Sequence, residues 1–211
     1  MRWLQAQPQG RMRKPCEGHT VSVVGKSLYV LFGKHEDDNA GSVCPPMQVL
    51  DTEAMVLSSP HIQQDPRTEV QLPADREGHT ATVIGRRIFV FGGTWTDEDD
   101  TTIYLNDLHV LDVARSDDAG TVVWSRPMTT GTPPIEREGH AAAAIGSRIF
   151  IFGGTWVDDE EQSHYLNDLH ILETDGMEWI HPTQAGGEPP MQREGHTASV
   201  IGAQIVRAAL E

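Results

Sequence analysis

The hydrophobic positions of this chain fall into short runs that end in glycine or in polar turns. Residues 79–84 (HTATVI) and 87–91 (RIFVF) are two such runs, and the Gly85-Arg86 pair between them suits a two-residue hairpin turn. Two further short runs follow at residues 108–111 and 122–124. Apolar residues do not recur at helical spacing in any segment, so the pattern predicts four short strands here and an all-β chain.

The same pattern recurs around the tripeptide Glu-Gly-His, which begins at residues 17, 77, 138 and 194. Each copy is followed by a run of small or β-branched residues that ends in glycine. A diglycine then stands at 92–93 and 153–154, the string YLNDLH begins at Tyr104 and Tyr165, and a tryptophan follows at 124 and 179. A four-stranded sheet cannot bury both of its faces alone, so the repeated units must stack on one another.

The order of diglycine, tyrosine and tryptophan resembles the kelch repeat of β-propellers, and the resemblance covers nearly the whole chain. It implies a kelch-type β-propeller of four-stranded antiparallel blades, whose strands run from innermost to outermost. The first copy departs from the pattern, because it has Phe32-Gly33 at the diglycine, Val43 at the tyrosine, Pro45-Pro46 at the Asn-Asp pair and Leu57 at the tryptophan. We therefore expect the first blade to be the least stable.

The repeat boundaries predict a single incomplete propeller over residues 1–211, with about three full blades and part-blades at both ends. Residues 1–8 are expected to form the outer strand of a preceding blade, since Trp3 precedes His19 by the same interval as Trp124 precedes His140. Blades are expected at 17–60, 77–127 and 138–182, and the inner strands of a last blade at 194–206. Three interpretations stay open: a fragment of a longer propeller, a four-bladed ring closed by the N-terminal strand, or a ring shared by two copies.

The charge of the chain narrows the choice of partner. Sixteen lysines and arginines stand against 31 aspartates and glutamates, which gives a formal net charge of −15. Such a field repels phosphate backbones, so nucleic acid is excluded as a partner. No apolar run approaches the roughly 20 residues that cross a bilayer, so no membrane partner is expected. With Cys16 and Cys44 as its only cysteines and no leader-like segment, the chain is expected in the cytoplasm, with the nucleus as the alternative.

Acidic runs occupy the connection between the second and third strands of each unit. In an up-and-down blade this connection lies on the same face as the link between blades, so the repeat gathers carboxylates on one face. Like charges at close range favour a basic partner or a cation, although the same residues would also serve as solvated loop ends. The predicted partner-binding residues are Trp95, Asp97, Glu98, Asp99, Asp100, Trp156, Asp158, Asp159, Glu160 and Glu161, and a further acidic run lies at 35–38.

The two tryptophans of that set directly precede the acidic runs. They are candidate anchors for a partner, or else they pack the long loop against its blade. Three arginines, which precede Glu-Gly-His copies, complete the predicted set: Arg76, Arg137 and Arg193. One interpretation pairs these arginines with the neighbouring glutamates or the acidic loops. The other follows the resemblance to kelch binding faces, where arginines bind carboxylates of a ligand.

The histidines of the tripeptide repeat with the blades, so a repeated structural task, such as holding a loop by a hydrogen bond, is expected of them. His109 and His170, in the third strand, are expected to pack or to form hydrogen bonds. No GxSxG, P-loop or HExxH motif is present. Neither cysteine has an evident tyrosine partner for the cross-link of kelch copper-radical oxidases. We therefore predict no catalytic residue, no metal site, no cofactor and no enzyme activity.

These expectations favour a protein–protein interaction module or scaffold that binds a partner segment, of basic character, through loops on one propeller face. Self-association through open blade edges is expected as well. The alternatives are a kelch-fold metalloenzyme, similar to the copper oxidases or to the iron-dependent specifier proteins, and a non-functional fragment of a longer kelch protein. A fold does not by itself give a function, so this prediction depends on the resemblance.

Overall fold

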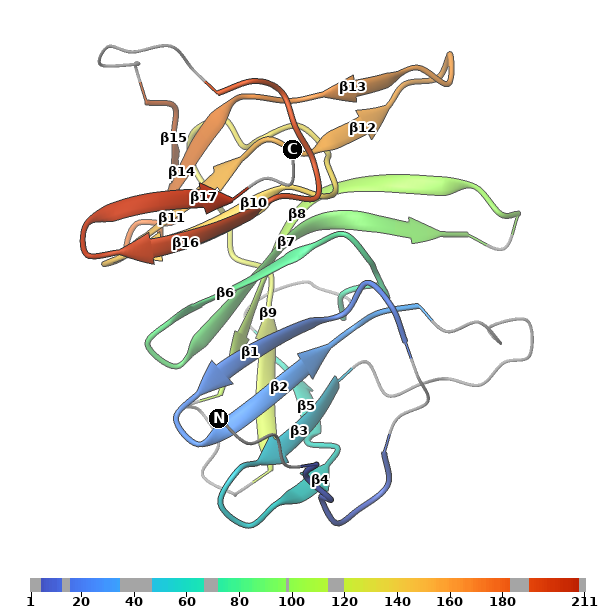
Figure 1. Cartoon of the computed structure of the whole chain (residues 1–211), viewed down its shortest axis with the longest axis vertical. Coiled ribbons are helices and arrows are strands. Elements are labelled where there is room, and N and C mark those ends of the chain that lie inside the picture. Colours follow the sequence, from blue (N-terminus) through green and yellow to red (C-terminus); the bar gives the residue numbers. More distant parts are fainter. Residues whose placement is uncertain are drawn as a thin grey trace.

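A computed structural model describes residues 5–12, 16–34, 47–66, 72–97, 99–113, 120–182 and 190–208. Within these ranges every regular element is a β-strand and no helix occurs. Figure 1 shows the sheets stacked side by side in a row that follows the order of the chain. The all-β architecture predicted from the hydrophobic pattern is therefore confirmed.

Two of the sheets are four-stranded and wholly antiparallel, with strands in chain order. The first sheet consists of β1 (Thr20–Val24), β2 (Ser27–Leu31), β3 (Met47–Asp51) and β4 (Val56–Ser58). The third sheet consists of β10 (Ala141–Ile145), β11 (Arg148–Phe152), β14 (Leu169–Glu173) and β15 (Glu178–Ile180). The hairpin of β12 (Thr155–Val157) and β13 (Ser163–Tyr165) extends beyond the third sheet, between β11 and β14.

The second sheet carries one strand more than the repeat predicts. Its antiparallel strands are β6 (Thr80–Ile84), β7 (Arg87–Thr96), β8 (Thr102–Asp112) and β9 (Thr121–Ser125). The additional strand, β5 (His61–Gln64), pairs in parallel with β9 at the outer edge. A last hairpin, of β16 (Thr197–Ile201) and β17 (Gln204–Ala208), ends the row.

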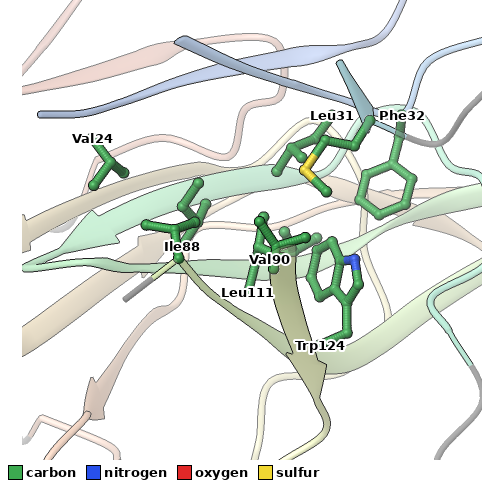
Figure 2. Close-up of a cluster of buried hydrophobic side chains, with 10 residues drawn as sticks. Val24, Leu31, Phe32, Ile88, Val90, Leu111 and Trp124 are labelled. Atoms are coloured by element: carbon green, nitrogen blue, oxygen red, sulfur yellow. The ribbon is translucent and has the colours of Figure 1, made fainter. Parts of the chain in front are cut away.

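The hydrophobic core lies between the sheets, because both faces of the second sheet are covered. Ile88 and Val90 belong to a cluster with Leu31 and Phe32 of the first sheet, which Figure 2 shows in close-up. The intervening Phe89 belongs to a second cluster, shared with the third sheet. Successive residues of a strand point to opposite faces. The continuous apolar run of β7 is thus explained by burial on both sides, as the sequence predicts.

The innermost strands β1, β6, β10 and β16 lie next to one another in that order. Side chains of the Glu-Gly-His histidines join them. Nε2 of His79 is 2.8 Å from Oγ1 of Thr20, and Nε2 of His140 is 2.9 Å from Oγ1 of Thr80. His79 and His140 therefore each bond to the preceding sheet, which confirms for these two histidines the expected hydrogen-bonding task.

The outer edges of the sheets are covered by the segments that lead into them. Gln9 forms a parallel bridge to Val56 of β4, β5 pairs in parallel with β9, and Thr130 forms a parallel bridge to Glu178 of β15. Gly131 permits this close approach, because its φ is +76° and a Cβ there would collide with the carbonyl oxygen of Trp179. A covered edge leaves fewer backbone groups open to another chain.

The row of sheets is open within the described residues, since β1 and β16 are separated by β6 and β10 (Figure 1). The predicted outer strand at residues 1–8 includes residues 1–4, which lie outside the described ranges. Residues 43 and 45–46 of the first copy lie outside them as well. The blade boundaries drawn from the repeat stay a prediction.

Candidate partner-binding face

Two long hairpins project from the same side of the row, one from the second sheet and one from the third (Figure 1). Each begins at a diglycine. In the first, Gly92 and Gly93 have φ of +62° and +93°, and Cβ atoms there would lie 2.8 Å from the Arg137 carbonyl oxygen and 2.5 Å from the Glu77 carbonyl oxygen. Only glycine tolerates this conformation and this proximity together. The diglycine therefore lets β7 turn past the neighbouring Glu-Gly-His loops and continue outward.

The turns at the tips of the two hairpins have the same hydrogen-bonding pattern. One carboxylate oxygen of Asp97 accepts hydrogen bonds from the backbone N–H groups of Asp99 and Thr101, at 2.9 and 2.8 Å. The carboxylate of Asp158 accepts the equivalent bonds from Glu160 and Gln162, at 3.0 and 2.9 Å. The first aspartate of each predicted acidic run therefore builds the turn. The exposed carboxylates that remain at the tips are Asp99, Asp100, Asp159, Glu160 and Glu161.

Glu98 and the acidic run at 35–38 lie outside the described residues. The first of the three acidic loops predicted to share a face therefore has no described position. The structure brings the other two together on one side of the molecule.

The two candidate tryptophans occupy equivalent positions on the hairpins and are half-buried. Trp95 stands opposite Ile103, and Trp156 stands opposite His164. The rings of Trp156 and His164 are stacked, with centroids 4.8 Å apart and planes inclined by 19°. A ring nitrogen of His164 lies 2.7 Å from the Asp158 carboxylate, and this hydrogen bond lowers the pKa of Asp158.

Glutamates of the Glu-Gly-His tripeptides form a second acidic group beside the hairpins. Glu77 pairs with Thr94 and Glu138 pairs with Thr155, at the roots of the two hairpins. Burial raises the pKa of Glu138, and the nearby carboxylates of Glu194 and Glu77 raise it further. Three successive repeats thus bring like charges into electrostatic contact. These glutamates were not among the predicted partner-binding residues, although their strict repetition in the sequence is a signal that could have found them.

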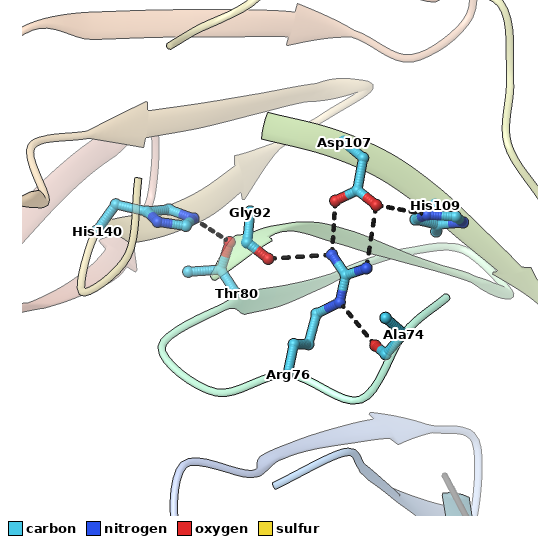
Figure 3. Close-up of polar contacts among 7 residues, drawn as sticks. All are labelled: Ala74, Arg76, Thr80, Gly92, Asp107, His109 and His140. Carbon is cyan, nitrogen blue, oxygen red and sulfur yellow. Dashed lines mark hydrogen bonds and ion pairs between the residues drawn. The ribbon is translucent and has the colours of Figure 1, made fainter. Parts of the chain in front are cut away.

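Two of the predicted arginines are interior residues, which corrects their assignment to a partner-binding surface. Arg76 is 3% exposed and Arg137 is 0% exposed. The guanidinium of Arg76 donates to both carboxylate oxygens of Asp107, at 2.6 and 3.0 Å, and to the carbonyls of Gly92 and Ala74, as Figure 3 shows. Arg137 repeats this arrangement with Asp168, at 2.7 and 2.8 Å. Donors so occupied do not reach a partner.

The partners of these arginines also differ from those expected. Arg76 and Arg137 pair with the aspartates of the NDLH strings instead of with the neighbouring glutamates or the acidic loops. A sequence signal existed: the first copy replaces the arginine by Cys16 and the aspartate by Pro46, so both members of the pair are lost together. The third arginine, Arg193, is half-buried, and its Nε donates to the carbonyl of Met191 at 3.0 Å.

The third-strand histidines complete the same network. Nε2 of His109 lies 2.8 Å from Asp107, and Nε2 of His170 lies 2.9 Å from Asp168. Burial opposes ionisation of Asp107, but the hydrogen bonds from His109 and Arg76 outweigh it and hold the pKa of Asp107 well below its usual range. The hydrogen-bonding task expected of His109 and His170 is confirmed.

No group of three or more His, Cys, Asp or Glu side chains is arranged to hold a metal ion within the described ranges. Nor do those ranges contain a helix of the length and apolarity that a membrane crossing requires.

Stacked antiparallel sheets joined at their inner strands, with a diglycine, a Tyr and a Trp at fixed places, define a kelch-type β-propeller. The chain belongs to the KLHDC2/KLHL20/DRC7 Kelch-repeats domain family, whose family model matches residues 1–208. Among solved structures, that of YjhT superposes with a TM-score of 0.65 at 15% identity, covering 95% of this chain and 59% of that one. This likeness shows the fold alone.

Several named proteins are similar to this chain over part of their own length. Acyl-CoA-binding domain-containing protein 4 of Arabidopsis thaliana is 31% identical over 89% of this chain and 25% of its own length. Host cell factor 2 of Homo sapiens is 34% identical over 95% of this chain and 25% of its own length. Kelch domain-containing protein 2 of Bos taurus is 29% identical over 84% of this chain and 44% of its own length. The chain thus spans a quarter to under half of these relatives.

Proposed function

We propose that this chain is a protein-interaction module that binds a partner segment through the face formed by its two projecting hairpins. Membership of the kelch-repeat family supports an interaction module in general. The observation that carries the proposal is the pair of matching hairpins, each with a turn organised by an aspartate and a half-buried tryptophan beneath it. Hydrogen bonds within the turns hold this surface in place before the partner arrives, which reduces the entropy lost on binding.

The partner that this face suits best is basic. Exposed carboxylates crowd the tips, the glutamates at the hairpin roots repel one another, and the whole chain carries a net charge of −15. Lysine or arginine side chains of a partner would relieve this repulsion and would be steered toward the face before contact. Trp95 and Trp156 would supply apolar contact area beside the charges, as aromatic anchors do at many interfaces.

Affinity capture from native lysate tests this proposal. The variant Asp99→Asn with Asp159→Asn removes charges from the tips and leaves Asp97 and Asp158 to hold the turns. The control, Glu53→Gln with Asp175→Asn, removes the same charge from exposed turns between the third and fourth strands of their sheets. We expect basic proteins that the wild type and the control retain at low salt to be lost with the tip variant. If the tip variant captured these basic proteins as well as the wild type does, the proposal of an acidic binding face would be wrong.

Self-association is the second proposal for this chain, and the exposed apolar residues at the two ends of the row favour it. Val23 of β1 is 59% exposed and Ile201 of β16 is 66% exposed. This proposal does not depend on the hairpins.

A further inference from the structure

The two projecting hairpins (Figure 1) match closely, but they differ at the position opposite the tryptophan. In the first hairpin Trp95 stands opposite Ile103, and in the second Trp156 stands opposite His164. Isoleucine has no ionisable group, whereas histidine side chains ordinarily titrate near pH 6.5. One hairpin thus contains a side chain that titrates near physiological pH, and the other has none at the equivalent position.

His164 contacts an aromatic ring and a carboxylate at the same time. Its imidazole stacks on the indole of Trp156, with ring centroids 4.8 Å apart and planes inclined by 19°. Its Nε2 lies 2.7 Å from Oδ2 of Asp158 and donates a hydrogen bond to it. The face of an indole and a carboxylate both attract the side chains of lysine and arginine. His164 therefore occupies two groups that a basic partner would use on this hairpin.

The turn at the tip of the second hairpin does not depend on the histidine. Oδ1 of Asp158 accepts two backbone N–H groups of the turn, and Oδ2 is the oxygen that meets His164. The first hairpin forms the same turn around Asp97, although it has Ile103 in place of the histidine. Protonation of His164 therefore changes the charge of the tip and leaves the backbone of the turn in place.

The charged groups around His164 are carboxylates. Among the described strands β13 pairs with β12 alone, and β12 carries no charged side chain. β13 itself adds the phenol of Tyr165, and phenols are neutral where histidine titrates. The hydrogen bond from His164 lowers the pKa of Asp158, so this carboxylate stays ionised in that range. The turn that joins the two strands carries Asp158, Asp159, Glu160 and Glu161.

We propose that His164 is a pH-sensitive competitor for the basic partner of the hairpin face, an inference that rests on the proposed function. At pH 8 the imidazole is neutral, and the carboxylates of the tip attract the partner with their full charge. At pH 5.5 the imidazolium lies on Trp156 and pairs with Asp158, so the hairpin holds a cation of its own and attracts the partner less strongly. Binding should therefore weaken as the pH falls.

Tryptophan fluorescence of the full chain tests this switch without any partner. A protonated imidazole in contact with an indole quenches its emission. His164→Gln keeps a hydrogen-bond donor for Asp158 but does not titrate, so the wild type should lose more emission than this variant between pH 8 and pH 5.5. His164→Ile copies the first hairpin and should behave like His164→Gln, whereas Ile103→His should add a loss from Trp95. Circular dichroism at both pH values verifies that each protein is folded.

Decalysine is the probe for the effect on binding, because lysine keeps its charge over this pH range. At low salt, acidification from pH 8 to pH 5.5 should weaken its binding to the wild type about two- to five-fold more than its binding to His164→Gln, as for one exposed charge. Glu138, whose pKa is raised, titrates in both proteins, so the difference isolates His164. His61→Asn, at an exposed histidine of β5, should behave like the wild type.

The two measurements separate the failure of this inference from the failure of the proposed function. Emission that changes equally with pH in the wild type and in both His164 variants would overturn the switch. Equal weakening of decalysine binding in the wild type and in His164→Gln would overturn it as well. A wild type that shows the emission change but does not bind decalysine at pH 8 would support the histidine switch and contradict the basic partner.

Discussion

Arg137 is the largest fully buried side chain of the described residues, and it is charged. A buried ion has to be paired and hydrogen-bonded, since desolvation is costly. Arg137 meets this demand with Asp168 and with the carbonyls of Gly153 and Ile135. Because the equivalent set surrounds Arg76, this network ties the entry loop of each of these two sheets to an aspartate that lies in the third strand (Asp107 in β8) or directly before it (Asp168, before β14).

Breaking this pair should cost far more stability than breaking an exposed one. Asp107→Asn leaves the charge of Arg76 buried without its counter-ion, so we expect the free energy of unfolding to fall by about 3–5 kcal/mol. Glu53→Gln breaks the contact between Lys26 and Glu53, whose side chains are 69% and 65% exposed, and should cost less than about 1 kcal/mol. Urea denaturation of both variants measures the contrast. Similar losses in both would contradict the structural task of Asp107.

At the residue scale, the sequence could identify which positions matter but not which positions meet. The repeat selected Arg76 and Arg137, yet it offered Glu77 and the acidic loops as partners because these are near in sequence. Asp107 lies 31 residues from Arg76. Only the folded third strand brings the two together. Joint loss of both residues in the first copy was the one clue available in a single chain.

The hairpins are elements whose direction depends on backbone freedom at the diglycine. Gly154 has φ of +99°, and a Cβ there would lie 2.6 Å from the carbonyl oxygen of Glu138. Gly154→Ala should therefore strain the junction and destabilise the chain by roughly 1–3 kcal/mol. Gly176→Ala is the matched control, since a Cβ at Gly176 meets nothing within 4 Å. Thermal melts should show a lower melting temperature for Gly154→Ala and little change for Gly176→Ala. Hydrogen exchange over residues 155–165 should likewise show reduced protection in the first variant only.

Most elements were predictable because their hydrophobic pattern repeats. Strands such as β7 and β10 follow from apolar runs bounded by glycine. The pattern gave no sign of β5, whose sequence HIQQ has one strongly apolar residue and whose partner β9 begins 60 residues later, at His61 opposite Thr121. A parallel edge strand of this kind is stabilised by backbone hydrogen bonds to a distant strand. Local sequence carries no record of that partner.

The whole molecule should lose stability in acid. Burial, together with the smaller effect of the nearby arginines, lowers the pKa of His79 and His140 from a usual value near 6.5 to about 3. As the pH falls below 6.5, the unfolded chain binds protons that the folded chain refuses until about pH 3. The free energy of unfolding should therefore decrease across this window, by about 2 kcal/mol per histidine at pH 5.

Urea titrations at pH 7 and pH 5 check this dependence. His140→Asn removes one of the titrating groups, so its stability should change less between the two pH values than that of the wild type. His61→Asn, at an exposed histidine, should keep the wild-type slope. Below about pH 4 the paired aspartates Asp107 and Asp168 add to the loss, because their lowered pKa values favour the folded state only while the unfolded carboxyls are ionised.

The parallel edge segments have a consequence for how the protein forms during synthesis. In each sheet the segment that pairs with the outermost strand is synthesised before the strands of that sheet. In the second sheet this segment is β5, which can pair only after β9 has been synthesised. No sheet is therefore finished until its final strand has returned to a segment made at its beginning. Each sheet is therefore completed when its own last strand has been synthesised. A nascent chain that stalls inside one repeat should leave the earlier repeats complete.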